Sequence, residues 1–377
     1  MGCGASRVLP ADEAAAVLEP SRLEFLEDGS LADPRAARAA VQRSGGLAAP
    51  LRARLWPPLL SLLPWDAAAG ARAASDEARR AVFVRLLDGE VDARHRKVID
   101  GDVPRTDRER PEWRDERSLA PLRQLLMAHC VHSPWGYSQG MADLAAVVLV
   151  ALGPSAVEHS PRGADSDASA ARLRDVAGDA PSPPPRSSNS DAASLSVAFW
   201  AFEAILNDSA PNWCEENLRG VWLQARAVLA VLRVEDPTLA KQILAIESTP
   251  LGTLLSEEQP FAFLFQPILL RLKREMRDYE QACRLWEVTW AMGGLRFSIV
   301  LLVAYIQSQR AHVMKLRPVP LAMADLHRTF SSLVGTMEAS PLLNAARRLW
   351  LRPRVHTALG KTELFARTST SVGTVAA

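Results

Sequence analysis

Two residues whose side chains could assist phosphoryl transfer lie in two short, separate segments. Arg105 belongs to VIDGDVPRTDR, residues 98–108, and Gln139 belongs to GYSQGM, residues 136–141. A guanidinium is a permanent planar cation that can stabilise charge developing on a transferring phosphoryl group. A carboxamide can hold an attacking water through its C=O and its NH2 group at once. Neither group needs a metal or a titrating base of its own, so the pair fits hydrolysis of a nucleotide that another protein holds.

The two segments are joined by a stretch with the pattern of an amphipathic helix. Ser118 can cap this helix, and Pro121 then falls in its first turn. His132 and the turn at Pro134 are expected to end it. We therefore expect the length of the helix to set the distance between the two loops. The apolar stripe at helical spacing consists of Leu119, Leu122, Leu125, Leu126 and Cys130.

Alone, Arg105 and Gln139 would be an ordinary loop arginine and turn glutamine. The motifs around them change that interpretation, since from about Gly45 to Leu351 the chain resembles the TBC domain, the catalytic domain of Rab GTPase-activating proteins. The nearest match is to the subgroup whose second motif continues into R-T-D-R and whose later helix carries R-L-W-E-V. Three blocks of the family occur in order: R-x-x-x-W as Arg52 and Trp56, I-x-x-D-x-x-R-T as Ile99, Asp102, Arg105 and Thr106, and Y-x-Q-G-M as Tyr137, Gln139, Gly140 and Met141.

The resemblance implies an all-α fold, a helical TBC-type domain of two subdomains. It also implies that Arg105 is an arginine finger and Gln139 a glutamine finger, both offered to a Rab-family small GTPase in its GTP-bound state. GTP and magnesium would come with that partner, so no cofactor and no metal site are expected in this chain. The other motif residues are expected to shape the loops or to contact the Rab: Arg52, Trp56, Ile99, Asp102, Thr106, Tyr137, Gly140 and Met141.

Three of these motif residues have a second interpretation. Trp56 fits a packing residue better than a ligand, and the same holds for Trp286 and Trp290, which stand four residues apart on a predicted helix. Arg52 and Asp102 either form a pairing that orients the finger loop or are exposed surface charges.

The chain departs from the family pattern just before its K-R-E tripeptide. Where close relatives usually read F-R-W, this chain has Phe265, Gln266 and Pro267. Gln266 removes a charge, and Pro267 lacks an N–H and would kink the interior of a helix. Because both fingers are unchanged, we expect the departure to affect the packing or the partner surface of the C-terminal half.

The composition is that of a globular protein without a charge bias. The 377 residues are 48% hydrophobic, and 44 Lys and Arg residues oppose 43 Asp and Glu residues, which gives a net charge of +1. A nucleic-acid partner would favour a strongly basic surface, and this chain has no overall basic charge, so no nucleic-acid partner is expected. Four cysteines, Cys3, Cys130, Cys214 and Cys283, include no C-x-x-C pair, so a reducing, cytoplasmic setting is expected.

Residues 1–20 carry a candidate membrane-targeting signal. The sequence MGCGAS fits M-G-x-x-x-[ST], which predicts N-myristoylation of Gly2 after removal of Met1. One myristoyl chain binds membranes only marginally, and palmitoylation of Cys3 would supply the second anchor. The alternative is a chance match in a disordered terminus. From these two lipids we expect a peripheral location on an endomembrane or the plasma membrane. A spanning helix is not expected, because the longest apolar runs, LAAVVLVALG and FSIVLLVAYI, are too short to cross a bilayer.

Two further stretches are expected to lie outside the packed helices. Residues 154–194 are rich in Ser, Asp, Ala and Pro, which predicts a disordered insertion within a TBC-type domain of residues 45–351. This insertion is either a phosphorylated regulatory loop or simply tolerated disorder. Residues 352–377 are predicted to form a C-terminal tail.

Three functions from different classes compete. The favoured one is activation of GTP hydrolysis on a Rab, in vesicle trafficking. The second is a membrane-attached adaptor that binds a small GTPase without catalysis; loss of a finger would be its usual sign, and both fingers are present. A stand-alone enzyme acting on a small molecule is disfavoured, because the sequence shows no constellation of a nucleophile and a base.

Overall fold

The residues that the structure, a computed structural model, describes are mostly helical. The described ranges contain three isolated β-bridges and no longer strand, which confirms the predicted all-α class. They divide into two compact units: unit 1, which combines Met1–Ala73 with Ala201–Ala377, and unit 2, Ala74–Trp200. The described residues are 15–153, 189–214, 218–248, 259–319 and 321–366.

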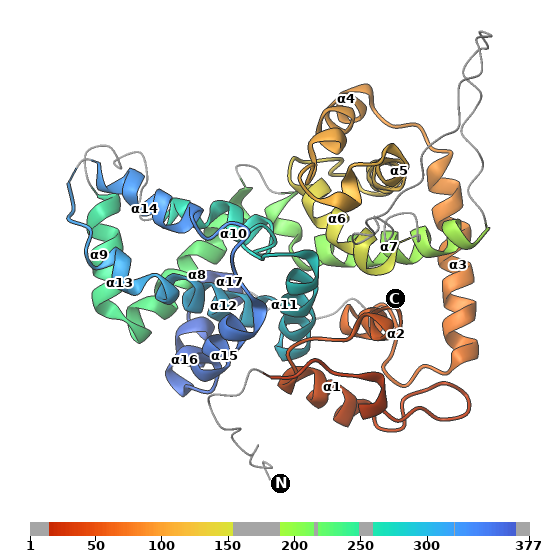
Figure 1. Cartoon of the computed structure of the whole chain (residues 1–377), viewed down its shortest axis with the longest axis horizontal. Helices are drawn as coiled ribbons and strands as arrows, with labels where there is room; N and C mark the ends of the chain where they lie inside the picture. Colours follow the sequence, from red (N-terminus) through yellow and green to blue (C-terminus); the bar gives the residue numbers. More distant parts are fainter. Residues whose placement is uncertain (1–14, 154–188, 215–217, 249–258, 320, 367–377) are drawn as a thin grey trace, which may run out of the picture. The chain divides into compact units, whose positions relative to one another are not determined.

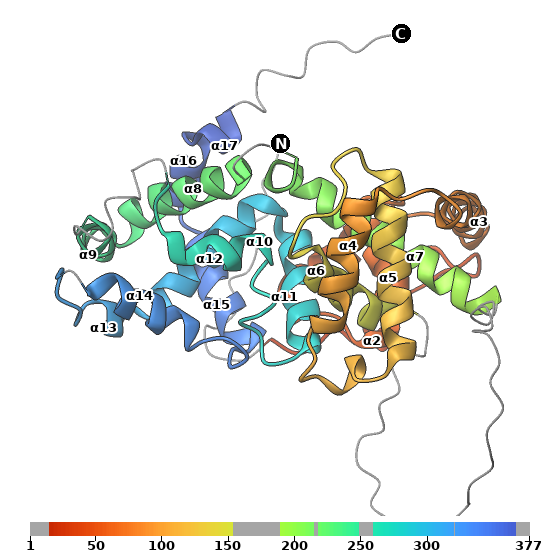
Figure 2. The ribbon, with the colours of Figure 1, turned by 90° about the horizontal axis from the view of Figure 1, so that it is seen from above.

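Unit 2 carries both predicted finger loops. Helix α6 is apolar on all sides and buried along most of its length, as expected for a helix surrounded by others. Helices α4 and α5 contact each other and lie side by side (Figure 2). Phe83 and Phe199 bring the two end helices together, with ring centroids 5.0 Å apart. The helices of unit 2 are α4 (Ala93–Asp102), α5 (Glu116–His132), α6 (Met141–Leu152) and the adjoining parts of α3 (Ala69–Leu87) and α7 (Asn189–Asp208).

Helix α5, between the two finger loops, begins earlier than the sequence predicted. Asp115 is its N-cap and accepts a hydrogen bond of 2.9 Å from the N–H of Arg117, so the predicted cap at Ser118 is wrong. Ser118 lies inside the helix and is buried, and Pro121 lies beyond the first turn. The predicted end at His132 is confirmed. Of the predicted stripe, Leu122, Leu125 and Leu126 are buried, whereas Leu119 and Cys130 are half-buried.

Unit 1 is centred on α11 and α12. Helix α11 packs on α1, α2 and α15, and α12 packs on α8 and α15. No described helix is both long enough and apolar enough to cross a membrane. The helices of unit 1, labelled in Figure 1, are α1 (Pro34–Arg43), α2 (Ala49–Leu59), α8 (Arg219–Glu235), α9 (Pro237–Glu247), α10 (Phe265–Leu269), α11 (Tyr279–Met292), α12 (Leu295–Ser308), α13 (Arg310–Val313), α14 (Ala322–Ser331), α15 (Ala339–Trp350), α16 (Pro353–Gly360) and α17 (Glu363–Ala366).

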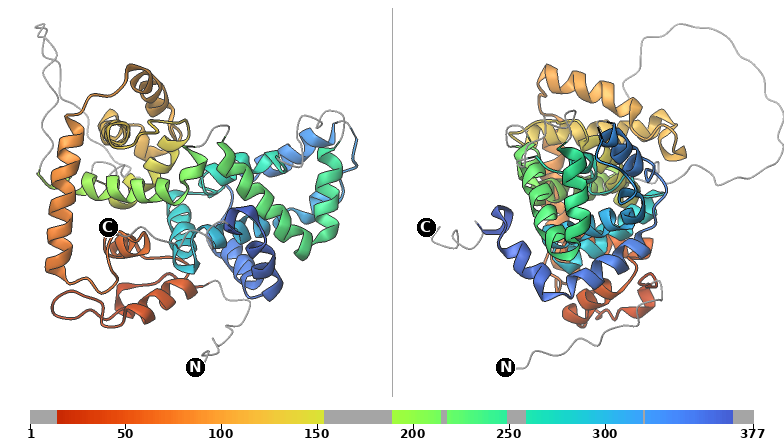
Figure 3. Two further views of the ribbon diagram at one scale, coloured as in Figure 1. Left: turned by 180° about the vertical axis from the view of Figure 1, so that it is seen from behind. Right: turned by 90° about the vertical axis from the view of Figure 1, so that its left-hand side faces the viewer.

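Unit 1 continues past Leu351, where the sequence predicted a tail. Helices α16 and α17 contact α8, and Figure 3 shows these blue C-terminal helices against the green α8. The Glu235 carboxylate at the end of α8 pairs with Arg352 and Arg354. Val355 and Phe365 are buried. The tail prediction fails for the described residues because this short amphipathic stretch has an apolar face to bury.

The predicted insertion, residues 154–194, overlaps the start of α7. Helix α7 begins at Asn189, and the negative charge of Asp191 in its first turn interacts favourably with the positive end of the helix dipole. Residues 154–188, the greater part of the predicted insertion, lie outside the described residues. At the other end of the domain, Leu18 is buried and forms a β-bridge with Leu47, so unit 1 contains residues before the predicted start at Gly45.

Candidate functional site

Arg105 lies on a short turn that follows α4 without a break. The turn is the 3-10 segment Val103–Arg105, which the fully buried Val103 anchors. Thr106, itself buried, closes the turn, because its N–H donates to the carbonyl oxygens of Asp102 and Val103 and its hydroxyl donates to that of Asp102. The side chain of Arg105 is 68% exposed. Its guanidinium is therefore accessible to a partner, while the backbone that carries it is fixed.

The carboxylate of Asp102 joins the arginine loop to the glutamine loop. Its Oδ1 accepts a hydrogen bond of 2.8 Å from Nη2 of Arg105, and its Oδ2 accepts one of 2.9 Å from the hydroxyl of Tyr137. Burial, together with the nearby Asp102 charge, raises the pKa of Tyr137, so this side chain remains a hydroxyl that can donate. The loops are thus linked through Asp102 on α4, and not only through the length of α5, as the sequence had suggested.

Gln139 lies between two anchored residues of its loop. Tyr137 on one side is buried, and Met141 on the other is fully buried as the first residue of α6. Gly140 has a φ of +104°, a left-handed conformation that favours glycine over residues with a Cβ. The Gln139 side chain is exposed and makes no hydrogen bond with the part of the chain that the structure describes. The carboxamide is therefore accessible on a backbone held at both sides.

Two histidines that the sequence interpretation overlooked also hold the glutamine loop. A ring nitrogen, Nε2, of the fully buried His129 lies 3.1 Å from the carbonyl oxygen of Gly136. Nδ1 of His95 accepts a hydrogen bond of 3.1 Å from the N–H of Tyr137. A signal for His95 was present in the sequence, because it stands at i−4 and i−7 from Ile99 and Asp102 and so shares their face of α4. Ile99 is fully buried and anchors that face.

Arg52 and Trp56 lie in unit 1, in the interior rather than at a surface. Oε1 of Glu287 accepts hydrogen bonds from Nε of Arg52 at 2.8 Å and from Nε1 of Trp56 at 2.9 Å. Oε2 of Glu287 accepts one of 2.7 Å from the N–H of Leu47. Burial raises the pKa of Glu287, and the contacts with Arg52 oppose that rise. Packing is thus the role of Trp56, as predicted, whereas the interpretation of Arg52 as an exposed charge is wrong.

Arg52, Asp102 and Glu287 all lie within one stretch of the sequence that matches a known family. The family model for the Rab-GTPase-TBC domain matches residues 49–314, well over half of the chain. The chain belongs to the Rab-GTPase-TBC domain family. The match includes α4, α5 and α6, so both finger loops are part of the TBC domain.

Curated relatives of this TBC domain are themselves longer proteins. TBC1 domain family member 17 of Homo sapiens is 25% identical over 287 residues, which cover 72% of this chain and 36% of that protein. GTPase-activating protein gyp7 of Schizosaccharomyces pombe (strain 972 / ATCC 24843) is 21% identical over 338 residues, which cover 81% of this chain and 37% of that protein. The chain thus spans little more than a third of the length of these relatives.

Solved TBC domain structures share the fold. The Ypt/Rab-GAP domain of Gyp1p matches with a TM-score of 0.65 at 15% sequence identity, over 87% of this chain and 94% of that one. The flagellar RabGAP TBC domain of Chlamydomonas matches with a TM-score of 0.56 at 14% identity, over 84% of each chain. At such identities the likeness establishes the helical TBC fold.

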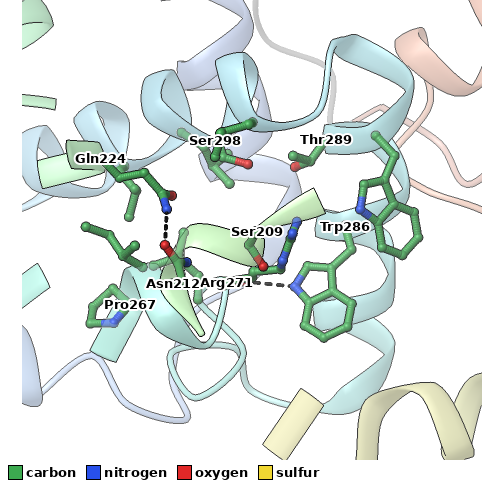
Figure 4. Close-up of a pocket in the computed structure, with 14 residues that line it drawn as sticks. Ser209, Asn212, Gln224, Pro267, Arg271, Trp286, Thr289 and Ser298 are labelled. Atoms are coloured by element: carbon green, nitrogen blue, oxygen red, sulfur yellow. Dashed lines mark hydrogen bonds between the residues drawn. The ribbon is translucent and has the colours of Figure 1, made fainter. Parts of the chain in front are cut away.

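The departure at Gln266 and Pro267 lies away from the two loops in sequence and is confined to unit 1. Pro267 is in the first turn of the short α10, where the missing N–H is tolerated. It lines a small cavity with Arg271 and Trp286, whose Nε1 donates a hydrogen bond of 2.9 Å to the carbonyl oxygen of Arg271 (Figure 4). The cavity has a volume of about 30 Å³, enough for one or two water molecules and far too small for a nucleotide.

Two other predictions about this TBC domain concern lipids and metals. Gly2 and Cys3, the predicted lipidation sites, lie outside the described residues. Among the residues that the structure does describe, no cluster of three or more His, Cys, Asp or Glu side chains could hold a metal ion.

Proposed function

We propose that this chain accelerates GTP hydrolysis on a Rab-family small GTPase, to which it offers Arg105 and Gln139 in trans. The observation that carries the proposal is the Asp102 carboxylate, which links an exposed arginine and the loop of an exposed glutamine within one unit. The names of two similar proteins add support, since one is a GTPase-activating protein and the other a Ypt/Rab-GAP domain. The GTPase would bring both GTP and magnesium.

Arg105 would stabilise the charge that develops on the γ-phosphoryl group. In the unbound protein its guanidinium, on a side chain that is 68% exposed, is held by Asp102. Phosphate oxygens in a site from which water is excluded are stronger acceptors, so the guanidinium can exchange Asp102 for the nucleotide. An arginine finger raises the rate by roughly 10³–10⁵-fold.

Gln139 would position the attacking water in place of the GTPase's own glutamine. Its carboxamide can hold the attacking water through its C=O, which accepts, and through its NH2 group, which donates. Because the anchors of Tyr137 and Met141 hold the backbone on either side, little backbone freedom remains to be lost when the partner binds. Thr106, Gly140 and Met141 would act by shaping the two loops.

The membrane would be reached through the N-terminus. Myristoylation of Gly2 and palmitoylation of Cys3 together would give the two anchors that stable residence requires. A peripheral position on a membrane would keep the domain at the surface where vesicle trafficking takes place.

The proposal is tested by single-turnover GTP hydrolysis across a panel of purified, GTP-loaded Rabs. We expect at least one Rab to hydrolyse GTP orders of magnitude faster with this protein than without it. Binding of a GTP-loaded Rab with no acceleration would instead establish the adaptor function. Binding is measured in parallel with a non-hydrolysable GTP analogue, so that the two functions are separated in the same panel.

A further inference from the structure

His95 is the second side chain through which α4 holds Tyr137. Its Nδ1 accepts from the N–H of Tyr137 at 3.1 Å, while Asp102 accepts from the hydroxyl of the same residue at 2.9 Å. The two acceptors stand at i and i+7 on one helix, with the fully buried Ile99 between them. Tyr137 is therefore held at its backbone and at its tip by one rigid element.

The contact between His95 and the glutamine loop is unusually close at Gly136. Gly136 has a φ of +66°, and a Cβ added there would lie 2.3 Å from both Cε1 and Nε2 of His95. No ordinary side chain fits in that space, so the imidazole lies directly against the backbone of the loop. The carbonyl oxygen of Gly136 is in turn 3.1 Å from Nε2 of His129 on α5. Residues 136 and 137 are thus held between two helices.

We propose that His95 is a positioning residue for the glutamine finger, an inference that rests on the proposed function. Gln139 follows Tyr137 by two residues, and its own exposed side chain makes no hydrogen bond in the part of the chain described. The backbone anchors at Tyr137 and Met141 therefore determine where the carboxamide can reach. His95 touches neither nucleotide nor water in this mechanism; it acts through the backbone of Tyr137.

The hydrogen bond also specifies the state of the ring. Nδ1 can accept from the N–H of Tyr137 only when it carries no proton, so this geometry predicts the tautomer of His95 with its proton on Nε2. Nitrogen-15 NMR of histidine-labelled full-length protein reports this directly. The Nε2–H tautomer is expected for His95, and the Nδ1–H tautomer would overturn the proposal.

Two substitutions separate the hydrogen bond from mere filling of space. In His95→Asn the amide oxygen occupies the place of Nδ1 and can still accept, whereas His95→Leu has a similar bulk and no acceptor. With a Rab that responds to the unmodified protein, we expect His95→Leu to lower kcat about tenfold or more with little change in KM, because displacement of a catalytic group by a fraction of an ångström weakens transition-state contacts. His95→Asn should retain kcat within about threefold. Equal losses for the two variants would overturn the proposal.

A double-mutant cycle identifies the group through which His95 acts. If His95 serves Gln139, then His95→Leu should have little further effect in a Gln139→Ala background. The same fold loss in both backgrounds would show that His95 acts elsewhere and would overturn the proposal. Thermal unfolding checks each variant, and if His95→Leu does not fold, the cycle is run with His95→Phe and the tautomer measurement stands independently. No stimulation of any Rab by the unmodified protein would refute the proposed function, whereas stimulation that His95→Leu leaves intact would refute only this inference.

Discussion

The hydroxyl of Tyr137 donates a hydrogen bond of 2.9 Å to Oδ2 of Asp102, although the two residues stand 35 positions apart in the chain. The other oxygen of that carboxylate accepts from Arg105 at 2.8 Å. One side chain on α4 thus relates the two loops on which the proposed chemistry depends. The relation is also testable, because each of its hydrogen bonds can be removed by a substitution that changes few atoms.

Arg105→Lys should remove most of the stimulation of GTP hydrolysis. An ammonium keeps the positive charge but lacks the planar, multidentate contacts of a guanidinium, so we expect a loss of at least about 100-fold in the single-turnover rate. Arg108→Lys is the matched control, since Arg108 is an exposed arginine of the same loop. A rate that Arg105→Lys leaves unchanged would exclude the arginine-finger role.

Gln139→Ala should be about as damaging, and the partner supplies the informative comparison. When the switch glutamine of the Rab is replaced by alanine, stimulation by the unmodified protein should largely persist, because Gln139 provides the water-positioning amide. Gln124→Ala, an exposed glutamine on α5, serves as control. Loss of all stimulation with the altered Rab would show that the partner's glutamine performs this step.

Tyr137→Phe should lower kcat about fivefold while leaving the melting temperature nearly unchanged, because it removes one hydrogen bond worth roughly 1 kcal/mol between the two loops. Asp102→Asn should be more damaging, since it also removes the charge that holds Arg105. Tyr305→Phe, which deletes a buried hydroxyl in unit 1, is the control for general effects on folding. If both Tyr→Phe variants behave alike in the hydrolysis assay, the Asp102 bridge has no catalytic importance.

Glu275→Gln should change how stability depends on pH. The carboxyl group is 2% exposed, its Oε2 has no hydrogen-bond partner among the described residues, and burial raises its pKa from 4.5 to about 7. Between these values the folded state binds the proton and the unfolded state does not, so the stability from this group is full below about pH 4.5 and is lost as pH rises through 7. Denaturant midpoints measured from pH 4.5 to 8 should therefore fall less steeply for Glu275→Gln. The exposed Glu27→Gln should leave the profile unchanged, and identical profiles for Glu275→Gln and the parent would contradict the expectation.

Gly2→Ala should release the protein from membranes into the soluble fraction of the cell. Cys3→Ser should leave weak, reversible binding, because a single myristoyl chain holds a protein only marginally. Gly4→Ala, which preserves the M-G-x-x-x-[ST] pattern, should remain membrane-bound. Intact-mass measurement that finds an unacylated N-terminus on the native protein would exclude this mode of attachment.

The sequence by itself determined the helical class and the residues of the two motif loops. Apolar residues at helical spacing predicted α5, and its end at His132 followed from local signals. Local signals also misled at element starts, since both Asp115 and Ser118 can cap a helix and only the packing of Ser118 into the interior decides between them. Whether the amphipathic stretch after Leu351 is helical also depends on tertiary packing. Its eight-residue helix α16 is too short to be stable alone and forms where α8 covers its apolar face.

Only the tertiary structure decided what the charged motif residues do. In the sequence, Arg52 and Asp102 are both simply charged residues of a motif. In the structure, Arg52 is buried and donates to Glu287 of α11, whereas Asp102 accepts from Arg105 and Tyr137. Such partners are far apart along the chain, and local propensity carries no information about them. The sequence likewise could not show why residue 136 is a glycine. The His95 ring leaves no room for a Cβ at that position only once α4 and the glutamine loop have packed together.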